Sequence, residues 1–103
     1  MEIYTGGRGQ GKTSKTIQLS AEKQIPIVCC SYHQMEYIEY RAKEMNLKMP
    51  KPIMFDDVRG KVIGNRRGLI VDDLDFLLRR LFDDEVHYAT MRTCNITRVE
   101  KES

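Results

Sequence analysis

The chain has no long hydrophobic run, since no stretch approaches the roughly 18 apolar residues that a membrane crossing requires. Its first residues, MEIYTGG, also lack the basic and apolar regions of a secretory signal. Neither sign of charge dominates: 17 Lys and Arg against 15 Asp and Glu give a formal net charge of +2, which does not by itself indicate a nucleic-acid binder. We therefore expect a cytoplasmic protein without a membrane partner, and 103 residues allow one domain, residues 1–103.

Cysteine is scarce, with Cys29 and Cys30 adjacent and Cys94 far along the chain. This odd count without a C-x-x-C spacing excludes both a disulfide framework and a zinc site. We expect these residues to act as small apolar side chains in a reducing compartment.

Short apolar segments alternate with helical patterns along the chain. Strands are predicted at residues 2–5, 25–31, 69–71, 86–90 and 96–99, and helices at residues 12–23, from Ser31 to about Met45, and 74–81. The run IPIVCCS at residues 25–31 suits a strand buried on both faces. The alternation predicts an α/β domain with a mostly parallel sheet of four or five strands and helices on both faces.

The helices carry their own signals. Ser31 and Gln34 form a capping-box pattern, and an apolar stripe follows at Met35, Ile38, Ala42 and Met45. Leucines at positions 74, 77, 78 and 81 form a second stripe. Residues 48–52 read as a proline-containing loop, and Asp56 with Asp57 could cap a short helix ending near Ile63.

The strongest motif lies between the first strand and the first helix. Residues 6–13, GGRGQGKT, match G-x-x-x-x-G-K-[ST] in full, a match expected by chance in roughly 0.3% of chains this long. Glycines let backbone amides approach phosphate oxygens, and the helix N-terminus favours the same anion. Lys12 would reach the terminal phosphates, and the Thr13 hydroxyl would hold Mg²⁺. The expected phosphate-binding residues are Gly6, Gly7, Arg8, Gly9, Gln10, Gly11, Lys12, Thr13 and Ser14.

A second acidic element, Leu-Ile-Val-Asp-Asp, ends at Asp73. Asp72 would accept a Mg²⁺-bound water, and Asp73 would orient the attacking water. An apolar strand followed by Asp is also common as a helix N-cap for residues 74–81.

Together these motifs resemble those of P-loop NTPases of the additional-strand class, which includes RecA-like and AAA+ ATPases. A closer likeness, from Ile3 to about Thr93, is to small free-standing P-loop proteins of bacteriophages, for which no settled activity is implied. The resemblance implies a three-layer P-loop core that binds ATP or another nucleoside triphosphate with Mg²⁺, in the bacterial host cytoplasm. It also makes residues 86–92 similar to a sensor strand in which Thr90, and less strongly Arg92, would contact the γ-phosphate or its water.

The sequence departs from that family in two respects. Many P-loop ATPases have Glu where this chain has Asp73, and about ten residues remain after the sensor-like segment, too few for a helical lid. We therefore expect slow hydrolysis of ATP, in phage DNA metabolism, with a protein partner or self-association completing the site, to which Arg79 or Arg80 could contribute a finger. His33 is expected at the surface, and the basic residues between Arg41 and Arg67 could contact DNA.

Two other functions stay open. The chain could be a nucleotide-dependent binding module that docks on replication or other host machinery with little or no hydrolysis. It could also be a structural protein that kept the fold and lost nucleotide binding, which the intact Lys12–Thr13 pair disfavours.

Overall fold

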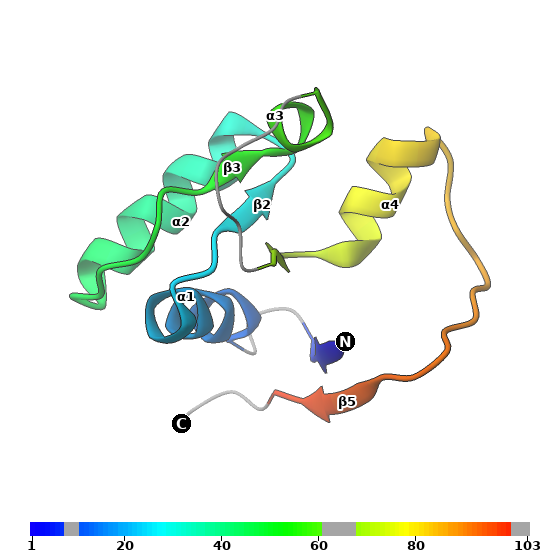
Figure 1. Cartoon of the computed structure of the whole chain (residues 1–103), viewed down its shortest axis with the longest axis horizontal. Helices are drawn as coiled ribbons and strands as arrows, with labels where there is room; N and C mark the ends of the chain where they lie inside the picture. Colours follow the sequence, from blue (N-terminus) through cyan, green and yellow to red (C-terminus); the bar gives the residue numbers. More distant parts are fainter. Residues whose placement is uncertain (8–10, 61–67, 100–103) are drawn as a thin grey trace.

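A computed structural model describes residues 1–7, 11–60 and 68–99 (Figure 1). The elements in chain order are β1 (Glu2–Thr5), α1 (Lys12–Lys23), β2 (Ile27–Cys29), α2 (Tyr32–Glu44), β3 (Ile53–Met54), α3 (Phe55–Gly60), β4 (Ile70–Val71), α4 (Leu74–Phe82) and β5 (Asn95–Arg98). The predicted α/β alternation is confirmed, and residues 2–5 and 12–23 form the strand and helix expected of them.

The five strands of the described residues form two sheets rather than one. β1 pairs with β5, and β2 lies between β3 and β4. Every pairing is parallel, with Ile3 opposite Ile96 in the first sheet and Val28 opposite both Ile53 and Val71 in the second. The expectation of parallel strands is therefore confirmed, whereas a single sheet of four or five strands is not what the structure shows.

The core lies where α1 and α2 pack on β2. Ile17 of α1, Ile27 and Cys29 of β2, and Ile38 and Ala42 of α2 form one buried cluster. All three β2 residues are buried, as a strand between two neighbours in a covered sheet requires. Met35 and Met45, the outer members of the α2 stripe, pack partly buried against this cluster.

The leucine stripe of α4, unlike the apolar stripe of α2, is not buried. The helix forms as its leucine spacing predicts, but none of its residues is buried, and Phe76 and Phe82 are 47% and 62% exposed. In Figure 1, α4 stands apart from the helices that cover β2, and the chain after it runs along the outside of the molecule to β5.

That outer connection, residues 83–94, corrects a sequence prediction. Residues 86–90 were expected to form a strand, but they are irregular, and Val86 and Tyr88 are 42% and 94% exposed. Alternating β-branched and aromatic residues favour a strand only when another strand edge pairs with them, and within the described ranges none does.

Three further expectations concern the ends of elements. α3 begins at Phe55, so Asp56 and Asp57 lie in its first turn rather than before it. Its expected extension to Ile63 and the polar tail after Val99 lie outside the described residues.

None of the helices in the described part of the chain has the length and apolar character of a membrane span.

Candidate functional site

The structure brings Thr13 and Asp72 together, two residues that the motifs singled out separately. The Thr13 hydroxyl, in the first turn of α1, donates to Asp72 Oδ2 at 3.4 Å. Asp72 directly follows β4, so the start of α1 and the end of β4 meet at one point. Hydroxyl and carboxylate oxygens are ligands that Mg²⁺ accepts, together with waters and substrate phosphates.

The turn into α1 depends on a glycine. Gly11 is the N-cap residue, with φ +84° in the left-handed region that residues with a Cβ rarely adopt. Its carbonyl accepts from the amide of Lys15 at 3.0 Å, which closes the first helical turn. Among the described residues no side chain caps this end of the helix, and amides at a helix start are donors that an anion can use. Arg8, Gly9 and Gln10 lie outside the described residues.

The Lys12 ammonium folds back over its own loop. Its Nζ donates to the Gly6 carbonyl at 2.8 Å, and the side chain is exposed. The donor of this exposed hydrogen bond is charged and its acceptor is neutral, so the ammonium gains Coulomb attraction when a phosphate oxygen replaces the carbonyl.

Asp72 is a half-buried carboxylate among hydrogen-bond donors. Burial raises its pKa above the usual 3.8, and the nearby charge of Asp73 acts in the same direction. Hydrogen bonds from Gln34, Thr16 and Thr13 oppose that rise by stabilising the ionised form.

The side chain of Gln34 makes contacts other than those that its capping-box pattern predicts. The backbone half of the capping box is confirmed, because Ser31 Oγ accepts from the amide of Gln34 at 3.1 Å. The Gln34 side chain instead accepts from the amide of Cys30 at 2.8 Å, and donates to the Asp72 carbonyl at 3.1 Å and to Asp72 Oδ2 at 3.4 Å. The only signal in the sequence was its position just after the second strand, at the carboxyl edge where ligands bind in open α/β sheets.

Ser14 is held by α2. Its hydroxyl accepts from Arg41 Nη2 at 3.4 Å, and Arg41 Nη1 also pairs with Glu44 at 3.6 Å. One basic residue of the stretch that could contact DNA is therefore directed at α1. Lys61, Arg66 and Arg67 of that stretch lie outside the described residues.

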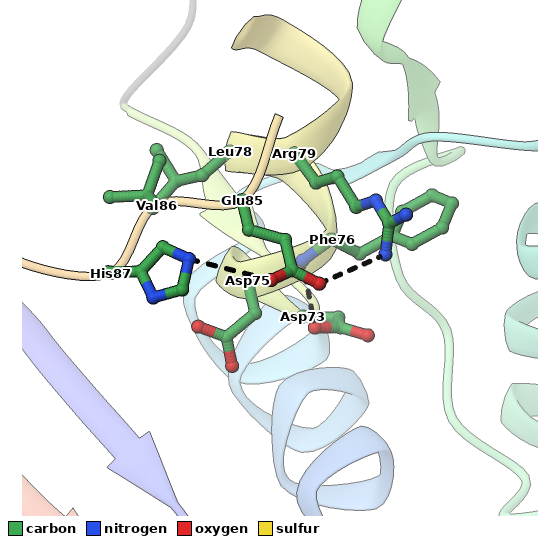
Figure 2. Close-up of a pocket in the computed structure, with 8 residues that line it drawn as sticks. All are labelled: Asp73, Asp75, Phe76, Leu78, Arg79, Glu85, Val86 and His87. Atoms are coloured by element: carbon green, nitrogen blue, oxygen red, sulfur yellow. Dashed lines mark hydrogen bonds and ion pairs between the residues drawn. The ribbon is translucent and has the colours of Figure 1, made fainter. Parts of the chain in front are cut away.

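Asp73 acts as the N-cap of α4. It adopts φ 67° and ψ 74°, and its Oδ1 accepts from the amide of Phe76 at 3.2 Å. Figure 2 shows Asp73 on the wall of a shallow pocket of about 400 Å³ between α4 and the chain that follows it, lined also by Leu78, Val86 and His87. The helix-cap interpretation of Asp73 is thus confirmed.

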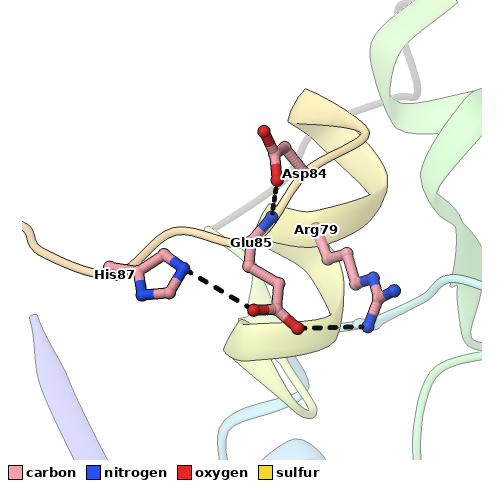
Figure 3. Close-up of polar contacts among 4 residues, drawn as sticks. All are labelled: Arg79, Asp84, Glu85 and His87. Atoms are coloured by element: carbon pink, nitrogen blue, oxygen red, sulfur yellow. Dashed lines mark hydrogen bonds and ion pairs between the residues drawn. The ribbon is translucent and has the colours of Figure 1, made fainter.

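An exposed carboxylate on this pocket lies between an arginine and a histidine. Glu85 pairs with Arg79 at 3.7 Å and lies 3.6 Å from His87 Nε2 (Figure 3). Arg80 pairs with Asp56 of α3 at 3.7 Å. Both candidate finger arginines therefore make ion pairs within the chain.

Thr90 and Arg92 lie in the irregular segment after α4 and are exposed. The structure does not place them at the end of a strand, because the strand that would carry them is not formed. His33 is exposed in the first turn of α2, as expected.

Within residues 1–7, 11–60 and 68–99, no three His, Cys, Asp or Glu side chains gather as a metal site would require. The donor set at Asp72 nevertheless fits Mg²⁺, which is commonly bound by one or two carboxylates plus substrate phosphates and waters. Comparison with protein-family models, curated proteins and solved structures finds no match to the chain.

Proposed function

We propose that the chain binds ATP, or another nucleoside triphosphate, with Mg²⁺ and hydrolyses it slowly. The observation that carries this proposal is the contact between Thr13 and Asp72, at 3.4 Å across 59 positions. The left-handed Gly11, the start of α1 and a carboxylate at the end of a parallel strand lie together there, which is the arrangement that phosphate and Mg²⁺ require together.

In this proposal the amides at the start of α1 and Lys12 bind the phosphates. Lys12 exchanges the Gly6 carbonyl for oxygens of the β- and γ-phosphates, moving from a neutral acceptor to a charged one. Thr13 and Asp72 would hold Mg²⁺, which neutralises charge that develops on the phosphate oxygens. Asp72 is suited to this role because three donors orient its carboxylate.

Slow turnover follows from Asp73. Its Oδ1 is engaged in capping α4, and its side chain is one methylene shorter than Glu, so its reach toward an attacking water is limited. A γ-phosphate contact from Thr90, which the family resemblance implies, would require the segment 83–94 to change its position.

We also propose that the two sheets are parts of one three-layer P-loop core. All five strands belong to parallel pairs, and the Thr13–Asp72 contact joins the helix that follows β1 to the end of β4. The resemblance to phage proteins is the basis for assigning this activity to phage DNA metabolism.

A nucleotide-dependent binding module is the second candidate, and α4 favours it. Phe76, Leu81 and Phe82 of this short helix are 47%, 43% and 62% exposed. Exposed apolar side chains gathered on one element are typical of protein contact surfaces. In this alternative ATP is bound but not turned over.

The test is ATP-binding calorimetry with Mg²⁺ alongside phosphate release, comparing the native chain, Lys12→Ala and Lys23→Ala. Lys23 is an exposed lysine in the last turn of the same helix, so its variant controls for the loss of one positive charge. Binding and turnover lost in Lys12→Ala but kept in Lys23→Ala support the ATPase. Binding without turnover in the native chain supports the module, and no binding refutes both.

A further inference from the structure

We infer that Gln34 is a positioning residue that holds the Asp72 carboxylate toward Thr13, an inference that rests on the proposed function. Gln34 lies in the first turn of α2, yet its side chain reaches the end of β4, 38 positions away. It connects three places at once: the amide of Cys30 after β2, the carbonyl of Asp72 and the carboxylate of Asp72.

The direction of the Gln34 amide is fixed by chemistry at both ends. The Cys30 backbone N–H can only donate, so the atom facing it at 2.8 Å must be the side-chain oxygen Oε1. The Asp72 carbonyl can only accept, so the atom facing it at 3.1 Å must be the nitrogen Nε2. A reversed amide would place donor against donor and acceptor against acceptor.

The hydroxyls of Thr13 and Thr16, the other two donors to Asp72, can each hydrogen-bond or coordinate another group instead. The single hydroxyl proton of Thr16 has a closer acceptor, the Lys12 carbonyl at 2.9 Å, than Asp72 Oδ1 at 3.4 Å. The Thr13 hydroxyl is the group expected to turn to Mg²⁺. Gln34 has two N–H protons for its two Asp72 acceptors, so it can keep the carboxylate oriented when Thr13 changes partner.

A purely structural explanation would make Gln34 part of the α2 cap. That function is already supplied by Ser31, whose hydroxyl accepts from the Gln34 backbone amide at 3.1 Å. Substitution of Ser31 therefore removes a contact of the helix end alone, whereas substitution of the Gln34 side chain removes the contacts with Asp72 and with the Cys30 amide.

The experiment measures the ratio of the ATP dissociation constant in EDTA to that in Mg²⁺ for the native chain, Gln34→Met and Ser31→Ala. Met has a similar length without the amide, and circular dichroism establishes that each variant is folded. For Gln34→Met we expect the ratio to fall about 10-fold, because loss of a residue that orients a metal ligand typically costs 10–100-fold in metal affinity. Binding in EDTA should stay unchanged, since the phosphate loop is intact.

A native-like ratio in Gln34→Met, or an equal fall of the ratio in Ser31→Ala, would overturn the positioning role while leaving the proposed function standing. Failure of the proposed function is visible separately, because the native chain would then bind no ATP in either buffer. That result would remove the role of Gln34 with it.

Discussion

Thr13 and Asp72 are 59 positions apart in the chain, and the hydroxyl of Thr13 donates to Asp72 Oδ2 at 3.4 Å. At this length the hydrogen bond is weak, so little free energy is lost when either group changes partner. The two side chains are therefore close enough to bind one ion, and the hydrogen bond between them is weak enough to break when the ion binds.

Replacing Thr13 with Val should weaken Mg²⁺-dependent ATP binding by about 10–100-fold, because the variant keeps the side-chain shape and loses a hydroxyl ligand. Calorimetry in Mg²⁺ and in EDTA measures the effect, which should be confined to the Mg²⁺ buffer. Thr16→Val is the matched control, since Thr16 also contacts Asp72 but its closer acceptor is the Lys12 carbonyl. Equal losses in both variants would show that Thr13 has no special relation to the metal.

Asp72→Asn should stabilise the ligand-free protein at pH 7. Burial raises the pKa of Asp72 above 3.8, so between 3.8 and the raised pKa the folded state retains a proton that the unfolded state has lost. The contribution of Asp72 to stability therefore falls as pH rises through that window and stays low above it. We expect a melting temperature a few degrees above that of the native chain at pH 7.

Measuring the same two chains at a second pH controls for effects of Asp72→Asn that do not depend on charge. Urea unfolding of both chains at pH 7 and at pH 3.5 should show that the difference in unfolding free energy shrinks on acidification, because Asp72 becomes mostly protonated in both states. A difference that is independent of pH would mean that the amide acts through packing and not through charge.

The sequence predicted those parts of the fold that depend on local signals. The Gly11 turn into α1, the Ser31 cap and the buried run centred on Val28 each determine an element through a few neighbouring residues, and each is confirmed. The approach of Thr13 to Asp72 could also be anticipated, because the two motifs assign both residues to one Mg²⁺ site.

The remainder depends on contacts between distant segments. The leucine spacing at residues 74–81 correctly predicts a helix, but it does not determine which surface packs against that helix. None of the α4 residues is buried. Val86 and Tyr88 have strand-forming side chains, but in the part of the chain that the structure describes no strand edge pairs with them. The hydrogen bonds from the Gln34 side chain to Asp72 could not be predicted. The capping pattern determines only the contact of the Gln34 backbone amide, and the partner of the side-chain amide depends on where β4 packs.

The buried face of α2 should dominate stability. Ile38 is fully buried in the cluster between α2 and β2, and we expect Ile38→Ala to cost about 2–5 kcal/mol in unfolding free energy through lost contacts and a cavity. Urea denaturation measures this loss. The matched variant Ile96→Ala removes the same atoms from a side chain of β5 that is 66% exposed, and should cost less than about 1 kcal/mol. Similar losses at both sites would contradict the placement of the core.

Cysteine reactivity tests whether β2 is the buried central strand of its sheet. Burial, with a smaller contribution from the charge of Asp72, raises the pKa of Cys29 to about 12, and burial also raises the pKa of Cys30. At pH 8 the thiolate fraction of Cys29 is then on the order of 10⁻⁴, and the thiolate is the form that reacts with alkylating agents.

Cys94 lies before β5 and is only half-buried. Iodoacetamide followed by mass spectrometry should therefore modify Cys94 first in the folded protein, and all three cysteines in concentrated urea. Equal modification of Cys29 and Cys94 without urea would show that β2 is open to solvent, and β4 could not then hold Asp72 in the position that the site requires.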